Sequence, residues 1–167
     1  MNYRIVKLGQ LSGQKATIYS VILEEDEATN TTLYDRFIRE NSDLFQAEII
    51  NIAKKLVAIG HKTGANHYYF KDWEGKPGDG VCAMYDDPDK SLRLYCIAFG
   101  RTVLIVGGGG HKPSGMHAFQ EDKKLTDENN LMRKVSDDLA KRIHDREIIW
   151  SEDEQELLGD FNFYDHE

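Results

Sequence analysis

The spacing of apolar and polar positions predicts an alternation of strands and helices, and it begins with a strand. Residues 16–25 (ATIYSVILEE) are rich in β-branched and aromatic side chains, which favour a strand. A polar break follows at residues 26–32, with residue types that commonly cap helices. Leu33, Phe37 and Ile38 then fall on one face of a short helix. The first part of the chain therefore predicts a strand followed by a helix.

A second helix is predicted over residues 43–59, ending before Gly60, a residue type that often follows a helix C-terminus. Its apolar positions repeat at helical spacing; they are Phe45, Ile49, Ile52, Ala53, Leu56 and Ile59. Because the two helices are consecutive and short, we expect them to form a hairpin that packs on a sheet.

Three strands are predicted next, in GVCAMYDD (80–87), SLRLYCIAF (91–99) and RTVLIVG (101–107). The last two are joined so tightly that they should pair as an antiparallel hairpin. Strand alternation should turn three residues of the middle strand toward the predicted helices and two away from them. The inward set is Leu92, Leu94 and Cys96, and the outward set is Arg93 and Tyr95.

The remaining chain predicts a loop over residues 107–126 and a helix over residues 127–146. The fold class is therefore α+β: a mostly antiparallel sheet of four to five strands packed on an N-terminal helical hairpin, with a C-terminal helix and an acidic tail. We expect the α+β domain to occupy residues 1–146 and a separate acidic, aromatic extension to occupy residues 147–167.

The charge of the chain changes this picture only at its C-terminus. The formal net charge is −8, and residues 147–167 contain eight Asp and Glu with no Lys or Arg, so residues 1–146 balance to zero. The same tail carries Trp150, Leu157 and Phe161. Either these side chains complete the core while the acids face water, or the tail covers a basic face of the domain and competes with an anionic ligand.

Localisation follows from three absences in the sequence. No apolar run approaches the ~20 residues that a membrane helix needs. The N-terminus lacks the apolar core of a signal peptide, and Cys82 and Cys96 lack metal-ligand spacing, so each is expected to be a buried thiol. These features predict a cytoplasmic protein without a membrane partner.

The run VLIVGGGGHKPSG (103–115) invites comparison with a phosphate-binding loop, but it lacks that motif. His111 separates Gly110 from Lys112, and Pro113 stands where Ser or Thr is required. Glycines also allow a strand to end, bulge or approach another backbone closely. The open question is why a histidine and a lysine follow directly.

Several segments in this order resemble the RelE/ParE toxin superfamily, especially its HigB-like and phage-derived host-killing branches. The resemblance covers roughly residues 17–143 and rests on IYSVI, the helical pair LYDRF to VAIG, YYFKDWEG, LRLYCIAF and VLIVGG ending in HKP. It implies a toxin of a toxin–antitoxin system that inhibits growth as a metal-independent mRNA endoribonuclease. Two departures concern the site: Ala83, Met84 and Tyr85 stand where an arginine is common, and His111-Lys112 replaces a pair of basic residues.

Cleavage of this kind uses the ribose 2′-OH as nucleophile, so it needs a proton acceptor, a proton donor and cations near the phosphate. The residues expected in these roles are His111 as base or acid, Arg93 and Lys112 at the phosphate, and Lys71 at the backbone or in proton transfer. Tyr95 or Tyr85 could stack on a base. We expect no cofactor, and the histidines lack zinc-ligand spacing.

The resemblance also implies partners: a cognate antitoxin protein, and mRNA or the ribosome. An alternative remains open, in which the same fold is a non-catalytic binding module or a protein inhibitor that acts through a protein partner. The missing strand arginine and the acidic balance favour this alternative, whereas His111 and Lys112 favour the nuclease.

Overall fold

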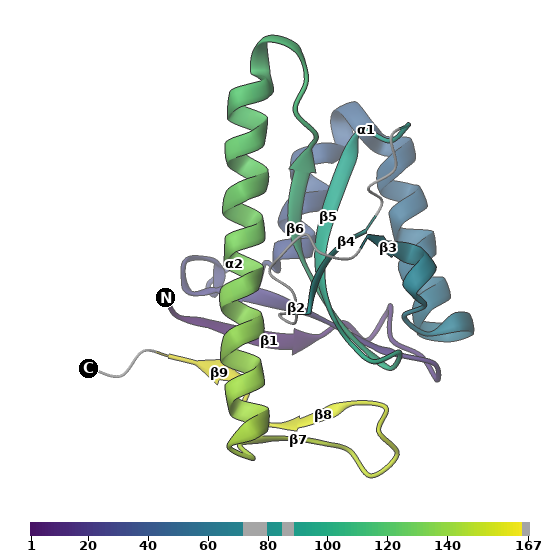
Figure 1. The fold of residues 1–167 in the computed structure, drawn as a ribbon, viewed down its shortest axis with the longest axis vertical. Coiled ribbons are helices and arrows are strands. Elements are labelled where there is room, and N and C mark those ends of the chain that lie inside the picture. Colours follow the sequence, from purple (N-terminus) through teal and green to yellow (C-terminus); the bar gives the residue numbers. More distant parts are fainter. Residues whose placement is uncertain (72–79, 85–88, 165–167) are drawn as a thin grey trace.

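A twisted sheet between two long helices forms the centre of the molecule (Figure 1). The computed structural model describes residues 1–71, 80–84 and 89–164. Within these residues the main sheet has seven strands in the order β3-β4-β5-β6-β2-β1-β9, and β7 and β8 form a separate hairpin. The strands are β1 Tyr3–Lys7, β2 Thr17–Leu23, β3 Phe70–Lys71, β4 Val81–Met84, β5 Leu92–Phe99, β6 Val103–His111, β7 Ile148–Trp150, β8 Leu157–Gly159 and β9 Asn162–Phe163.

The two long helices are α1 (Leu33–Ala58) and α2 (Ala118–His144). Shorter helical turns lie at Glu24–Asp26, Ile59–Thr63, His67–Tyr69 and Gly115–His117. Strand β2 pairs with β6 in parallel, and the other pairs of strands are antiparallel. The fold class is therefore α+β with a mostly antiparallel sheet, as predicted.

Side-chain alternation along the strands divides the interior into two cores. Leu92, Leu94 and Cys96 of β5 pack with α1, whereas Tyr95 and Ile97 pack on the α2 side. Both sets are buried. The predicted β5–β6 hairpin and the inward-facing set Leu92, Leu94 and Cys96 are thereby confirmed. The sheet is, however, covered on both faces rather than on one.

The predicted N-terminal hairpin of two separate helices needs correction, because α1 is one helical element with a sharp bend. It begins at a capping box in which Thr32 Oγ1 accepts from the Asp35 N–H at 3.0 Å, and the Asp35 carboxylate accepts from the Thr32 N–H at 3.0 Å. Its one non-helical residue is Phe45, with φ −132° and ψ 39°. The helix bends sharply there: Phe45 lies against His111 at one end of the sheet, whereas Tyr34 before it and Gly60 after it lie beside Ser20 and Lys15.

The strand count and the predicted loop after residue 107 also need correction. Strand β1 and the tail strand β9 bring the main sheet to seven strands instead of four or five. Strand β6 continues through the glycines to His111, and α2 begins at Ala118 instead of residue 127. The start of α2 was missed because its first turns have no apolar period in the sequence. Leu125 is the only residue that they bury before residue 126. Neither described helix carries an apolar stretch that could cross a lipid bilayer.

Candidate functional site

The glycine run of β6 (residues 107–110) is a packing surface for α2. All four glycines are buried. A Cβ at Gly107 would lie 2.4 Å from Met132 Sδ, and one at Gly108 would lie 2.4 Å from Glu128 Oε2. The α2 side chains nearest to Gly107, Gly108 and Gly110 are Met132, Glu128 and Lys124, each one helical turn from the next. The missing side chains therefore let α2 lie close against the strand.

Gly109 meets the neighbouring strand instead of the helix. A Cβ at Gly109 would lie 1.9 Å from the carbonyl oxygen of Arg93. This place is next to the shift in the β5–β6 register, which falls between positions Leu94 and Cys96 of β5. Only glycine allows the two backbones to come so close. The run is thus explained by packing on both sides, and the residues after it are the ones available for chemistry.

His111 ends β6 in contact with both helices. Its ring centroid lies 4.8 Å from that of Phe45 on α1, and its Nδ1 lies 3.1 Å from Glu121 Oε1 on α2. The Ser114 N–H donates to the other oxygen of Glu121 at 2.6 Å. The histidine side chain is 34% exposed, and its Nε2 makes no hydrogen bond within the described residues. A carboxylate at Nδ1 holds the imidazole in place and favours the tautomer whose Nε2 can accept a proton.

Arg93 and Lys112 lie at the same end of the sheet as His111. Arg93 is half-buried on β5 opposite Gly110, and His111 is opposite the adjacent Leu92. The Lys112 N–H donates to the Ser91 carbonyl at 2.8 Å, which extends the pairing past the strand end. Alternation directs Arg93 to the α2 side of the sheet, whereas His111 lies between the helices at the sheet's end. The three predicted residues are neighbours along two adjacent strands.

The other predicted residues are less closely grouped. Lys71 is exposed at the edge of the sheet, opposite Ala83 of β4, which is in turn opposite Tyr95 of β5. At ~4.8 Å between strands, it lies roughly 10 Å from β5. Tyr95 is only 2% exposed and packs in the α2-side core, so its ring offers no stacking surface. Tyr85 lies outside the described residues.

A partly buried ionic cluster joins α1 to α2 beside the glycine run, and none of its residues was predicted from the sequence. Arg36 Nη2 lies 2.6 Å and Lys124 Nζ 2.7 Å from Glu128 Oε1. Lys124 also lies 3.3 Å from Glu40. The Glu128 side chain is 5% exposed. The available signals were the four-residue spacings Arg36–Glu40 and Lys124–Glu128, which on a helix bring opposite charges together.

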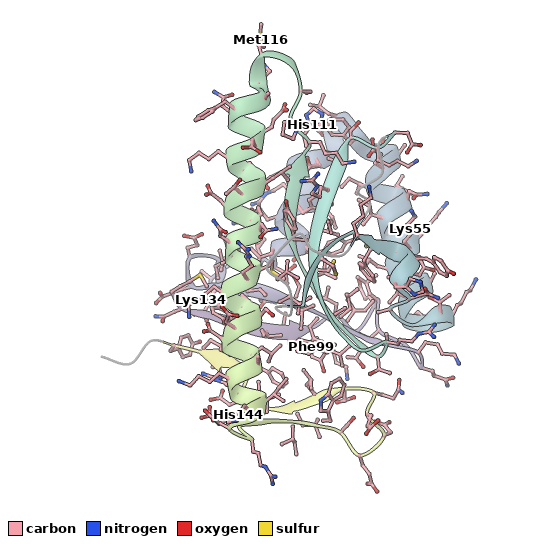
Figure 2. All side chains as sticks on the ribbon, in the orientation of Figure 1. Lys55, Phe99, His111, Met116, Lys134 and His144 are labelled. Carbon is pink, nitrogen blue, oxygen red and sulfur yellow. The ribbon has the colours of Figure 1, made fainter. Side chains whose placement is uncertain are left out.

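The acidic tail lies at the far end of the sheet from His111 (Figure 2). Thr102, directly before β6, donates from its hydroxyl to the Glu154 carbonyl at 2.7 Å. The ring of Phe163 stacks on that of Tyr3 at 4.8 Å and lies 3.9 Å from the Arg142 guanidinium carbon. Ile148, Leu157 and Phe163 are buried in the α2-side core. The tail therefore completes a core and does not cover His111 or Lys112.

Within the ranges that the structure describes, no three His, Cys, Asp or Glu residues gather in a way that could hold a metal ion. Among the described residues at the sheet's end, those with polar side chains include His111 held by Glu121, and the cations Arg93 and Lys112. The chain was compared with protein-family models, curated proteins and solved structures, and none of them matches it.

Proposed function

We propose that this chain is a RelE-like toxin, or a protein derived from one, that cleaves mRNA without a metal ion. The observation that carries the proposal is the His111–Glu121 pair at the end of β6, with Arg93 and Lys112 beside it on adjacent strands. The order from β2 through α1, β4, β5 and β6 to α2 agrees with the order on which the resemblance to that family rests, with the single bent helix α1 in place of its helical pair.

The proposed reaction assigns one task to each side chain. His111 Nε2 takes the proton of the ribose 2′-OH while the 2′-oxygen attacks the adjacent phosphorus. Arg93 and Lys112 neutralise the charge that develops on the phosphorane oxygens. The bond from phosphorus to the 5′-oxygen breaks, and that oxygen takes a proton from solvent or a neighbouring acid. The products are a 2′,3′-cyclic phosphate and a 5′-OH end.

Glu121 is a positioning residue in this scheme, because it contacts the imidazole and not the substrate. It holds Nδ1 of His111, and its second oxygen is fixed by the Ser114 N–H. A carboxylate in this place also stabilises the imidazolium that forms when Nε2 is protonated. Glu121→Gln should lower the cleavage rate without abolishing RNA binding.

The test is cleavage of a translated mRNA by the purified chain in a reconstituted translation reaction. An aliquot is taken shortly after initiation, and a chelator of divalent ions is added to half of it, so that cleavage with and without the chelator can be compared. His111→Ala should reduce cleavage about 100-fold or more, since positioned acid–base groups contribute about 10²–10⁴. Lys112→Ala should reduce it as well, because the charge that stabilises the phosphorane is lost. Matched controls are His117→Ala and Lys123→Ala, because both side chains are exposed and lie outside the proposed site. Equal cleavage by His111→Ala and His117→Ala would remove the proposal.

One observation favours a non-catalytic binding module as the second candidate. Ala83 and Met84 of β4 are fully buried, and Tyr95 is buried as well, so β4 and β5 present no further cation or stacking ring beside Arg93 among the described residues. If this candidate is correct, soluble expression slows growth without mRNA cleavage, and the inhibition survives His111→Ala.

A further inference from the structure

Helix α1 carries an apolar stripe that faces solvent and is bordered by lysines. The stripe, called here the α1 stripe, consists of Ile50, Ala53, Lys54, Val57, Ala58 and Lys62, which line one shallow depression. Ile50 is 48% and Val57 41% exposed. Their spacing places them on one face of the helix, while Ile49, Ile52 and Leu56 fill the core on the other. The second half of α1 is thus apolar on two sides, and the structure covers only one of them.

The segment that carries the α1 stripe is basic. Residues 49–71 contain four lysines and neither Asp nor Glu. Lys54 and Lys62 are exposed, and neither forms an ion pair with another described residue. A surface that combines exposed apolar side chains with unpaired lysines fits a partner that is apolar at its centre and acidic around it.

The β7–β8 hairpin of the same chain has that composition. Ile149 and Leu158 are cross-strand partners, and both are exposed, at 50% and 44%. Glu152 and Glu154 lie in the connection between the two strands, are exposed, and form no ion pair within the described part of the chain. These four residues, the hairpin face, lie on the outer side of the hairpin, whose inner residues Ile148 and Leu157 are buried.

We propose that the hairpin face of one copy docks on the α1 stripe of a second copy. Association would cover four large apolar side chains, Ile50 and Val57 on one copy and Ile149 and Leu158 on the other, and would bring Glu152 and Glu154 toward Lys54 and Lys62. The two surfaces do not meet within a single molecule, since their large apolar and charged side chains remain exposed there. The contact joins two different surfaces, so it is heterologous and continues beyond two copies unless the rotation closes a ring.

The size and charge of the contact determine how it should behave. Two large apolar side chains on each copy are far fewer than the ~20–30 residues per side of a stable interface. The association should therefore be reversible and concentration-dependent. Because exposed charges are screened within ~8 Å at physiological salt, raising the salt concentration should weaken it.

Sedimentation velocity of the full chain over a range of concentrations tests the proposal by charge exchange. The stripe variant carries Lys54→Glu and Lys62→Glu, the hairpin variant carries Glu152→Lys and Glu154→Lys, and the exchanged variant carries all four. Wild type should show an average mass that rises with concentration, the first two variants should stay monomeric, and the exchanged variant should associate again. An equimolar mixture of the stripe and hairpin variants should also associate.

Lys123→Glu on α2 is the matched control, because that lysine is 67% exposed and lies outside both surfaces. It should sediment like wild type, and all variants should melt like wild type by circular dichroism. A wild type that stays monomeric at every concentration overturns the proposal. Loss of association in the stripe variant without recovery in the exchanged variant also overturns it, because the stripe would then bind something other than the hairpin face.

Discussion

At the residue scale, burial decides the ionisation of Tyr34 in α1. Its side chain is 6% exposed, in the core between α1 and the sheet. Burial, with a smaller contribution from the neighbouring Asp35 carboxylate, raises the pKa of Tyr34 to about 12. Burial also raises the pKa of Tyr19, on the opposite face of the sheet. Folding therefore favours the neutral phenols, and this preference makes stability depend on pH in the alkaline range.

The Tyr34 contribution is fully present below the unfolded-state pKa of ~10 and is lost as the pH rises toward about 12. Two pKa units correspond to at most about 3 kcal/mol. We expect the free energy of unfolding to fall between pH 10 and 12, and to fall less steeply in Tyr34→Phe. Urea titrations at several pH values measure how steeply the free energy of unfolding falls with pH in the wild type and in Tyr34→Phe. Parallel curves for the two proteins would show that Tyr34 is not the responsible group.

At the element scale, the packing of α2 and β5 against the glycine run is the feature most sensitive to substitution. A Cβ at Gly109 would meet the Arg93 backbone at 1.9 Å, which no side-chain movement relieves. A Cβ at Gly110 would lie 3.3 Å from Lys124 Cγ, part of a flexible side chain. The two neighbouring glycines therefore make a matched pair of sites.

We expect Gly109→Ala to destabilise the protein by about 3 kcal/mol or more, at the upper end of overpacking effects. Gly110→Ala should change the free energy of unfolding by less than about 1 kcal/mol. Thermal and urea unfolding of both variants gives the comparison. If the two substitutions cost the same, the close approach of β5 and β6 at Gly109 is not as described.

The elements also show which parts of the fold the sequence could predict. The alternation of Leu92, Leu94 and Cys96 with Arg93 was sufficient for β5, because one strand face packs on α1. The glycines concealed the end of β6, since glycine favours no strand and its role depends on α2, which is distant in sequence. The strands of the tail have two or three residues each, too few to show a period.

The candidate site was predicted in part for a similar reason. His111 and Lys112 follow an apolar strand directly, so their position could be read from the order of residues. Glu121 could not be found, because the residues between it and His111 resemble a loop and only the fold brings the two side chains to 3.1 Å. The burial of Tyr95 was hidden because a strand with helices on both faces buries both sets of alternating side chains.

At the scale of the whole molecule, the tail belongs to the core. Ile148, Leu157 and Phe163 are each buried, and burial of one large apolar side chain contributes about 1.5–3 kcal/mol. Total stabilities of domains are about 5–15 kcal/mol. Removing these three side chains, together with the stacking of Phe163 on Tyr3, therefore takes away much of the total stability of the domain.

Truncation after Arg146 should abolish the cooperative melting transition or lower its midpoint severely. Glu152→Gln with Glu154→Gln removes acidic charge and keeps the buried residues, so this control should melt like wild type. Circular dichroism melts of the wild type, the truncated chain and the control compare the midpoints and the cooperativity of unfolding. A truncated chain that melts cooperatively near the wild-type temperature would mean that the tail is dispensable for the fold.

The measurement that bears most directly on the central claim is the mapping of mRNA 5′-OH ends in cells after induced expression of the chain. Wild type should slow growth and create new 5′-OH ends within translated messages, because the proposed reaction leaves that end. Arg93→Ala and His111→Ala, expressed to the same soluble level, should create far fewer ends and restore growth. Soluble wild-type protein that produces no new 5′-OH ends would contradict the account, whatever its effect on growth.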